Sequence, residues 1–320
     1  MSKKYNRIKS YHQIKFSVAA EKWLGYTKLH VKRSTYENYI YLLNKHIYPY
    51  FKDIDMRRLN CGMINDFTVE KLTSGRLKQK GGISKKYLQD ILSIVKSVAN
   101  FCEQEYGIQN KINHTRGLKV EKTEMKVLEK TEQQTLAETL TKSDNPFNIG
   151  ILLSLYTGMR IGEVCGLKWS DYNEVQETIT VNRTVQRISN NNGSTVLLVG
   201  SPKTEASARV IPLPSFLCRI LSKVKQNPEQ TIIPAEKEYA EPAELRRHFK
   251  NVLRKCGISE IRFHDLRHRF ATHCIEVGFE VKTLSEILGH SNVNITLNRY
   301  VHSSLEQKRI NMDKLQENCI

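Results

Sequence analysis

The sequence predicts a mainly α-helical protein with a small antiparallel β-sheet. Apolar residues recur at helical spacing through residues 16–108 and again in several segments after residue 127. Short β-branched stretches with alternating polarity lie between residues 178 and 214, a pattern typical of antiparallel strands. A length of 320 residues fits two domains better than one. We therefore expect an N-terminal four-helix domain followed by a larger α+β domain.

Changes in composition along the chain predict the domain limits. Residues 1–15 are basic and polar and are expected to form a flexible arm, and residues 16–108 hold the helical domain. Residues 109–126 are polar and lack apolar periodicity, as expected of a linker. The second domain then covers residues 127–302, and residues 303–320 form a C-terminal tail.

Capping residues predict where the N-terminal helices begin. Ser34 and Glu37 have capping-box spacing, and the helix that follows them is expected to stop at Pro49. Asn60 is placed to begin a third helix, and Ser84 to begin a long fourth one. The four helices have apolar stripes that are expected to form one core.

An arginine follows a buried helix in the second domain. The segment after Pro146 is almost entirely apolar, which predicts a helix buried on all sides, and Gly158 breaks it. Arg160 comes directly after this break and is expected to be held rigidly against the core. Two interpretations stay open, because Arg160 is either a site residue or simply a partner of Glu163.

Three strand-like stretches follow, at residues 178–188, 194–200 and 208–214. Asparagines and a glycine mark the first turn between them, at residues 190–193. The second turn is polar and presents Lys203. A lysine at the tip of a hairpin is usually just solvated, so Lys203 by itself predicts nothing.

Residues 264–300 bring several polar side chains together. Asp265 is expected to cap a helix, with Arg267 in its first turn and His264 just ahead of it. A second helix over residues 281–288 is predicted to end at a glycine, with His290 next to it. A third short element begins near residue 294 and carries Tyr300 close to its end.

A metal site is the alternative for the histidines of this segment. His264 and His268 have the spacing of two ligands on one helix. The residue after His264 is Asp265 rather than the glutamate of a zinc-protease helix, and His268 is expected to face along the helix rather than converge with His290. We therefore predict neither a metal nor a cofactor.

Positive charge is concentrated in the first part of the chain. The net charge is +17, and residues 1–120 hold 23 Lys and Arg against 9 Asp and Glu. Such an excess favours a polyanionic partner, DNA above all, although RNA binding or a merely basic surface stays open. The basic residues near the loop at 76–86 are the candidate DNA contacts: Arg76, Lys78, Lys80, Lys85 and Lys86.

Other features exclude whole classes of protein. No apolar run is long enough to cross a membrane, and the N-terminus lacks the apolar region of a signal peptide. Seven cysteines are scattered without any CxxC pair, which indicates reduced thiols. These features together predict a cytoplasmic protein.

Five motifs occur in the order TGMRIGE, PKTEASAR, HDLRH, LGH and RY. Over almost the whole chain, this series resembles the tyrosine recombinase (phage integrase) family, with Met159 where a leucine is usual. The resemblance implies a helical core-binding domain, a linker and an α+β catalytic domain. The implied catalytic residues are Arg160, Lys203, His264, Arg267, His290 and the nucleophile Tyr300, with Glu163 in support.

The chemistry of DNA cleavage agrees with these assignments. Attack on a phosphodiester builds negative charge on the phosphoryl oxygens, and the guanidinium forks of Arg160 and Arg267 match those oxygens. A tyrosine hydroxyl ordinarily has a pKa near 10, so Tyr300 needs a base or cationic surroundings to become an effective nucleophile. His264 is expected to assist this proton transfer.

The remaining roles follow from the resemblance. His290 is expected to hydrogen-bond the phosphate, and Lys203 to protonate the departing 5′ oxygen. The expected product is a 3′-phosphotyrosyl link and a free 5′ hydroxyl. No metal is demanded, and religation needs no ATP.

Strand exchange implies four protomers on two double-stranded recombination sites, with a monomer or weak dimer away from DNA. The tail at 303–320 is expected to dock on a neighbouring subunit, or alternatively to fold back on its own chain. Residues 1–15 leave little room for an arm-binding domain, so the chain looks like a resolvase, an invertase or the integrase of a compact mobile element. A directionality factor is a possible further partner.

Two alternatives share parts of this pattern. A type IB topoisomerase uses the same nicking and religation without a second duplex, but the order of the motifs resembles integrases better. A DNA-binding regulator that has lost catalysis should have lost at least one of the six polar site residues, and all are present. The target sequence and the direction of recombination stay open.

Overall fold

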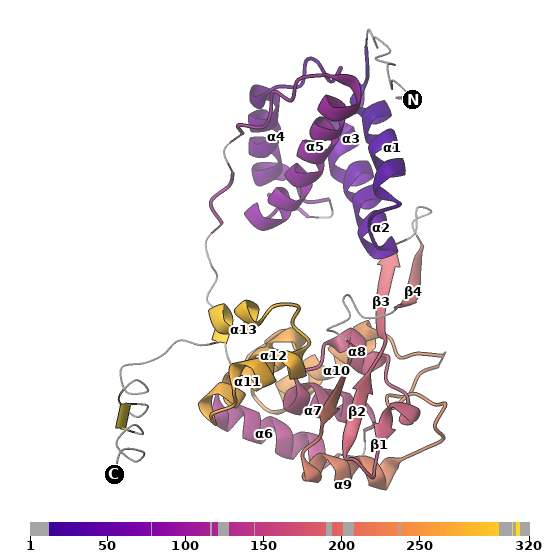
Figure 1. Cartoon of the computed structure of the whole chain (residues 1–320), viewed down its shortest axis with the longest axis vertical. Helices are drawn as coiled ribbons and strands as arrows, with labels where there is room; N and C mark the ends of the chain where they lie inside the picture. Colours follow the sequence, from indigo (N-terminus) through magenta and orange to yellow (C-terminus); the bar gives the residue numbers. More distant parts are fainter. Residues whose placement is uncertain are drawn as a thin grey trace, which may run out of the picture. The chain divides into compact units, whose positions relative to one another are not determined.

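The computed structural model describes residues 13–77, 79–115, 117–120, 128–143, 145–189, 194–200, 208–236, 238–300, 309, 312 and 313. The chain divides into two compact units, the first of residues 1–123 with 188–196 and the second of residues 124–187 with 197–320 (Figure 1). Within the described ranges, none of the helices combines the length and the apolar character that a bilayer crossing needs.

The first unit is helical and has one core. Its elements are α1 (Phe16–Thr27), α2 (Arg33–Leu42), the π-helical turn η1 (Leu43–Ile47), α3 (Tyr48–Phe51), α4 (Cys61–Ser74) and α5 (Lys85–Tyr106). Phe16, Phe51 and Phe67 are fully buried at its centre. The predicted starts of α4 and α5 are confirmed, because Asn60 and Ser84 each accept a hydrogen bond of 3.2 Å from a backbone N–H of the first turn.

The predicted limits of the second helix are wrong at both ends. Helix α2 begins at Arg33, one residue before the predicted cap Ser34, and Lys32 is its N-cap residue. The helical path also continues through Pro49, which lies in the first turn of α3. A proline is tolerated there because the backbone N–H groups of a helix's first turn have no partner within the helix, so the missing N–H of Pro49 breaks no hydrogen bond. The π-helical turn η1 directly precedes α3.

Part of the predicted linker packs on the first core. Ile112 is 1% exposed, and Asn110 is buried and bonded to Asn100 and Asn113. A single isoleucine produces no periodicity, so the polar composition of residues 109–126 concealed this contact. Residues 121–126 lie outside the described ranges.

The second unit is organised around α7, which is buried on all sides as predicted. Its helices are α6 (Lys130–Thr141), α7 (Phe147–Thr157), α8 (Ile161–Cys165), the 3₁₀ turn η2 (Trp169–Asp171), α9 (Ser215–Val224), α10 (Pro242–Lys255), α11 (Phe263–Glu276), α12 (Val281–Leu288) and α13 (Val293–Tyr300). Helix α7 packs against α6, α8, α9, α10 and α11 (Figure 1). Its position fixes the polar segment that follows it.

The small antiparallel sheet is confirmed and has two parts. Strands β1 (Tyr172–Asn173), β2 (Thr178–Val181) and β5 (Arg209–Pro212) pair in the order β1-β2-β5, while β3 (Thr184–Ser189) pairs with β4 (Thr195–Gly200). Arg209 begins β5 and lies opposite Val181. The two predicted turns, at 190–193 and around Lys203, lie outside the described residues.

The predicted cap of α11 is three residues late. Arg262 is the N-cap residue, and Asp265 accepts a hydrogen bond of 2.8 Å from the backbone N–H of Arg262. His264 therefore lies inside the first turn rather than ahead of it. As a result, His264 and His268 share one face of α11, and their ring centroids are 4.6 Å apart.

Gly158 turns the chain from α7 toward the polar segment. Its φ of 67° is left-handed, a conformation that side chains disfavour. A Cβ at this position would also lie 2.6 Å from Phe270 and 2.7 Å from Leu288. Backbone conformation and crowding both require a glycine here.

We expect Gly158→Ala to destabilise the second unit by about 3 kcal/mol, of which about 1 kcal/mol comes from the left-handed backbone and the rest from overpacking. Gly257→Ala is the matched control, because Gly257 has the same φ of 67° and open space around it. Urea unfolding followed by Trp169 fluorescence in a Trp23→Phe background measures the difference. Equal losses in the two variants would contradict the crowding argument.

Candidate active site

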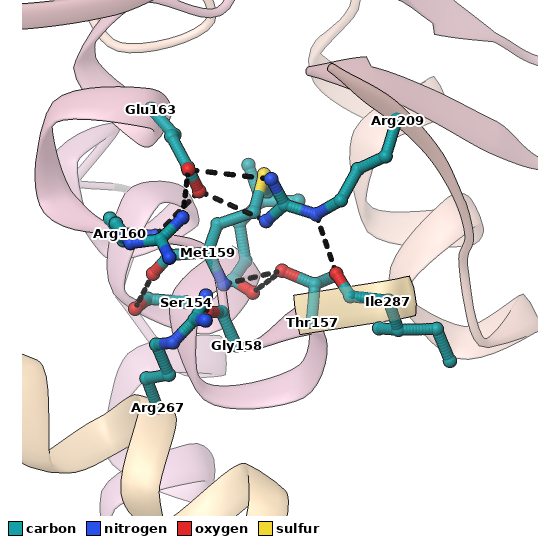
Figure 2. Close-up of polar contacts among 10 residues, drawn as sticks. Ser154, Thr157, Gly158, Met159, Arg160, Glu163, Arg209, Arg267 and Ile287 are labelled. Atoms are coloured by element: carbon teal, nitrogen blue, oxygen red, sulfur yellow. Dashed lines mark hydrogen bonds and ion pairs between the residues drawn. The ribbon is translucent and has the colours of Figure 1, made fainter. Parts of the chain in front are cut away.

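A buried carboxylate joins two arginines from different elements. Glu163 on α8 is 3% exposed. Its Oε1 accepts a hydrogen bond of 2.7 Å from Nη1 of Arg160, and its Oε2 one of 3.0 Å from Nη2 of Arg209. Figure 2 shows Glu163 between the two guanidinium groups. Arg209 lies in the motif PKTEASAR, but sequence reasoning missed its role.

The predicted pairing of Arg160 with Glu163 is confirmed, and it leaves the guanidinium accessible. Glu163 also accepts a hydrogen bond of 2.9 Å from the Arg160 backbone N–H and so caps α8. The side chain of Arg160 is nevertheless 39% exposed, whereas that of Arg209 is 6% exposed. The pairing with Glu163 therefore orients a guanidinium that a ligand can still reach.

Electrostatics keep Glu163 ionised. Burial by itself raises the pKa of this carboxyl, but the charge and hydrogen bonds of Arg209, followed by those of Arg160, outweigh burial and leave the pKa below its usual value. Arg209 is also anchored by a hydrogen bond of 2.5 Å from its Nε to the Ile287 carbonyl on α12 (Figure 2). Glu163 thus connects α8, β5 and α12.

Arg267 is a buried cation with an unfilled donor. It is 2% exposed, and its Nη1 donates to the Gly158 carbonyl at 2.8 Å. Its Nη2 has no hydrogen-bond partner among the described residues. Burial and then the charge of Arg160 lower the pKa of Arg267 to about 9, so the group remains charged at neutral pH. An anion beside Arg160 and Arg267 would supply the missing acceptor and offset the repulsion.

Tyr300 is held inside the second unit by a histidine. Its hydroxyl lies 2.6 Å from Nδ1 of His268, and it packs beside Ala271 and Leu288. Tyr300 is 9% exposed and His268 3%. The sequence singles out His268 only as a candidate metal ligand and does not predict this contact with Tyr300. The helical spacing in HDLRH indicated its face, but not the packing of α13 against α11.

The other two predicted histidines lie close by. His264 is exposed, and its ring stands edge-on to that of His268. His290 is half-buried directly after the left-handed Gly289, and its Nδ1 lies 2.8 Å from Oγ1 of the buried Thr296. Thr296 fixes the ring of His290, a role that no sequence signal had indicated.

The candidate DNA contacts of the first unit gather where α5 begins. Arg76, Lys80, Lys85 and Lys86 are all exposed. Arg76 donates to the Gly82 carbonyl at 2.9 Å, which orders the loop, and Lys86 pairs with Asp90 at 3.1 Å. Lys78 lies outside the described residues, as does Lys203 of the second unit.

Comparison with known families explains the geometry. A model described as the phage integrase family matches residues 121–307, and one described as the N-terminal SAM-like domain of phage integrases matches residues 15–68. The chain belongs to the phage integrase family. It is a site-specific tyrosine recombinase, an enzyme that breaks and rejoins DNA.

Relatives of known function agree with this membership. A XerC-like tyrosine recombinase of Caldanaerobacter subterraneus is 26% identical over 301 residues, which cover 85% of this chain and 76% of the relative. The ICEBs1 integrase of Bacillus subtilis is 23% identical over 325 residues, covering 97% and 85%. These relatives extend the similarity over both units of the recombinase.

Solved structures share the fold. The Tn1549 transposon integrase in complex with transposon right-end DNA has a TM-score of 0.77 at 19% identity, covering 95% of this chain and all of the other. A λ integrase tetramer bound to a Holliday junction has a TM-score of 0.65 at 18% identity, covering 95% and 85%. At these identities the likeness concerns the fold alone.

We expect Glu163→Gln to destabilise the second unit by about 3 kcal/mol at pH 7, because it leaves two arginines close together without their anion. The folded-state pKa of Glu163 is depressed, so its stabilisation is present above the usual glutamate pKa near 4.3 and is lost as pH falls below that value. Urea midpoints from pH 7 to pH 3 should therefore converge for the recombinase and the variant.

Glu286→Gln is the control for this titration, since Glu286 is an exposed residue of α12. It should follow the unmodified recombinase at every pH. A difference between Glu163→Gln and the unmodified recombinase that stays constant down to pH 3 would contradict the role of the ionised carboxylate.

Proposed function

We propose that Tyr300 attacks a DNA phosphodiester held by Arg160 and Arg267, forming a 3′-phosphotyrosyl link and releasing a 5′ hydroxyl. The unfilled Nη2 of the buried Arg267 carries this proposal. A phosphoryl oxygen is the acceptor that a guanidinium fork matches best, and cations in a water-poor pocket stabilise the charge that develops during attack. The partly exposed Arg160 supplies the second fork.

The position of Tyr300 supports its role as nucleophile. Tyr300 lies on α13, which packs against α11, the helix that carries Arg267. Tyr300 also packs on α11 and α12 of its own chain, so we propose that each protomer cleaves the DNA bound by its own arginines. His264 and His290 complete the phosphate pocket, and Lys203 protonates the leaving 5′ oxygen.

We further propose that four protomers assemble on two recombination sites and that the reaction integrates or excises a mobile element. The λ integrase tetramer on a Holliday junction supports the assembly of four protomers. The ICEBs1 and Tn1549 integrases, named for mobile elements, support integration or excision of such an element. A directionality factor that biases the outcome and docking of residues 303–320 on a neighbour belong to the same proposal.

Covalent capture tests the nucleophile. The recombinase and Tyr300→Phe are expressed in cells, the cells are denatured rapidly, and DNA that stays attached to protein is sequenced. We expect attachment through 3′ phosphates at one recurring site, at least 100-fold above the variant, because phenylalanine has no attacking oxygen.

Other outcomes would contradict parts of the proposal. Attachment that persists in Tyr300→Phe would move the nucleophile to another residue. Scattered attachment would favour a topoisomerase-like activity over site-specific exchange. His273→Asn is a matched control on α11, since His273 is a half-exposed residue whose described ring contact is with Glu276. It should give the same attachment as the unmodified recombinase.

The basic residues at the start of α5 are expected to bind DNA phosphates. Replacing Lys80, Lys85 and Lys86 by alanine should weaken DNA binding at all sequences and reduce the slope of log K against log salt concentration by about 2 to 3. Fluorescence anisotropy with duplex DNA at several salt concentrations measures this slope. An equal slope change from alanine at Lys223 and Lys225, at the end of α9, would show that net charge alone is responsible.

A further inference from the structure

The nucleophile has a proton acceptor within hydrogen-bond distance. Oη of Tyr300 and Nδ1 of His268 are 2.6 Å apart, which is short for an O–H···N contact. Both side chains are at least nine-tenths buried. With the imidazole protonated on Nε2, Nδ1 accepts the phenolic hydrogen. The hydroxyl is therefore oriented before any DNA arrives.

We infer that His268 takes the proton of Tyr300 during cleavage and returns it during religation. The inference rests on the proposed role of Tyr300. As Oη forms its bond to phosphorus, the O–H bond breaks and the hydrogen passes to Nδ1, while the bond from phosphorus to the 5′ oxygen breaks and that oxygen is protonated by the acid. In the reverse reaction, Nδ1–H protonates the departing Oη of Tyr300.

Electrostatics connect this transfer to DNA binding. Arg267, the residue before His268 in α11, is a buried cation, and the charge of Arg160 acts on Arg267. Another cation on His268 is costly in this pocket until a negative phosphodiester enters it. A phosphodiester beside Arg160 and Arg267 thus favours transfer of the proton to His268. His264, whose ring stands edge-on 4.6 Å away, is the exposed end of the same aromatic row.

The packing of α11, α12 and α13 fixes the contact between Tyr300 and His268. Tyr300 on α13 is confined by Ala271 and Cys274 of α11 and by Leu284 and Leu288 of α12. His268 lies on the face of α11 that carries Ala271, one turn away. The phenol ring is thus fixed on its apolar side, and its hydroxyl is directed at the imidazole.

The test separates activation of the nucleophile from protonation of the leaving group. Single-turnover cleavage is measured on the site recovered by covalent capture, with an ordinary substrate and with one carrying sulfur in place of the bridging 5′ oxygen. A thiolate leaves without a proton, so the sulfur substrate removes the need for an acid but not for a base. The variants are His268→Asn and His268→Gln, which keep an oxygen acceptor for the hydroxyl, together with Lys203→Ala and the control His273→Asn.

We expect His268→Asn and His268→Gln to bind DNA within about twofold of the unmodified recombinase and to cleave about 100-fold more slowly or worse on both substrates. Lys203→Ala should be slow on the ordinary substrate and restored on the sulfur substrate. His273→Asn should match the unmodified recombinase. The DNA affinity of each variant also verifies that it is folded.

Three outcomes would overturn the inference. Unchanged cleavage by either His268 variant would reduce the contact to a structural hydrogen bond. Restoration of a His268 variant by the sulfur substrate would place His268 at the leaving group. Loss of DNA binding in both variants would make the residue structural. Failure of the proposed function looks different, because the unmodified recombinase itself would then form no Tyr300-dependent adduct on the ordinary substrate.

Discussion

The ionised carboxylate of Glu163 is the interaction on which the rest of the site depends. It is buried, and it bridges Arg160 at the start of α8 with Arg209 at the start of β5. A lone charge in this position would be prohibitively desolvated, and two unpaired arginines would repel each other. The three groups together hold the sheet, α8 and α12 in one arrangement, and one guanidinium of that arrangement remains accessible.

The second unit is therefore folded with one buried cation, Arg267, that still lacks an anionic partner among the described residues. Glu163 offsets much of the charge of Arg160 and Arg209, but Arg267 is buried with one donor unfilled and with a depressed pKa. A phosphodiester bound here, as proposed, would provide both the missing acceptor and the missing negative charge. Pre-arranged cations of this kind need little reorganisation during attack, which is why they stabilise a transition state more effectively than water does.

Rigid packing fixes the position of Tyr300, the proposed nucleophile. Gly158, with its left-handed backbone, ends α7, and its carbonyl accepts the hydrogen bond from Arg267. Phe270 of α11 and Leu288 of α12 crowd the same glycine, so α7, α11 and α12 meet at this point. Tyr300 packs on α11 and α12 in turn. The distance from Arg267 to the phenol of Tyr300 is thus set by the core rather than by a loop.

The sequence by itself determined the fold class and several helix ends, and it singled out most of the candidate site residues, because caps, periodicity and short motifs are local signals. Arg160 and Glu163 are three residues apart, so their pairing could be foreseen. Only the tertiary structure decided that Arg209 reaches Glu163 across 46 positions and that His268 meets Tyr300 across 32. Spacing along a helix gives the face on which a side chain lies, but which distant element packs on that face depends on the whole core. The orientation of the Tyr300 hydroxyl, the anchoring of Arg209 and the unfilled donor of Arg267 all follow from that packing.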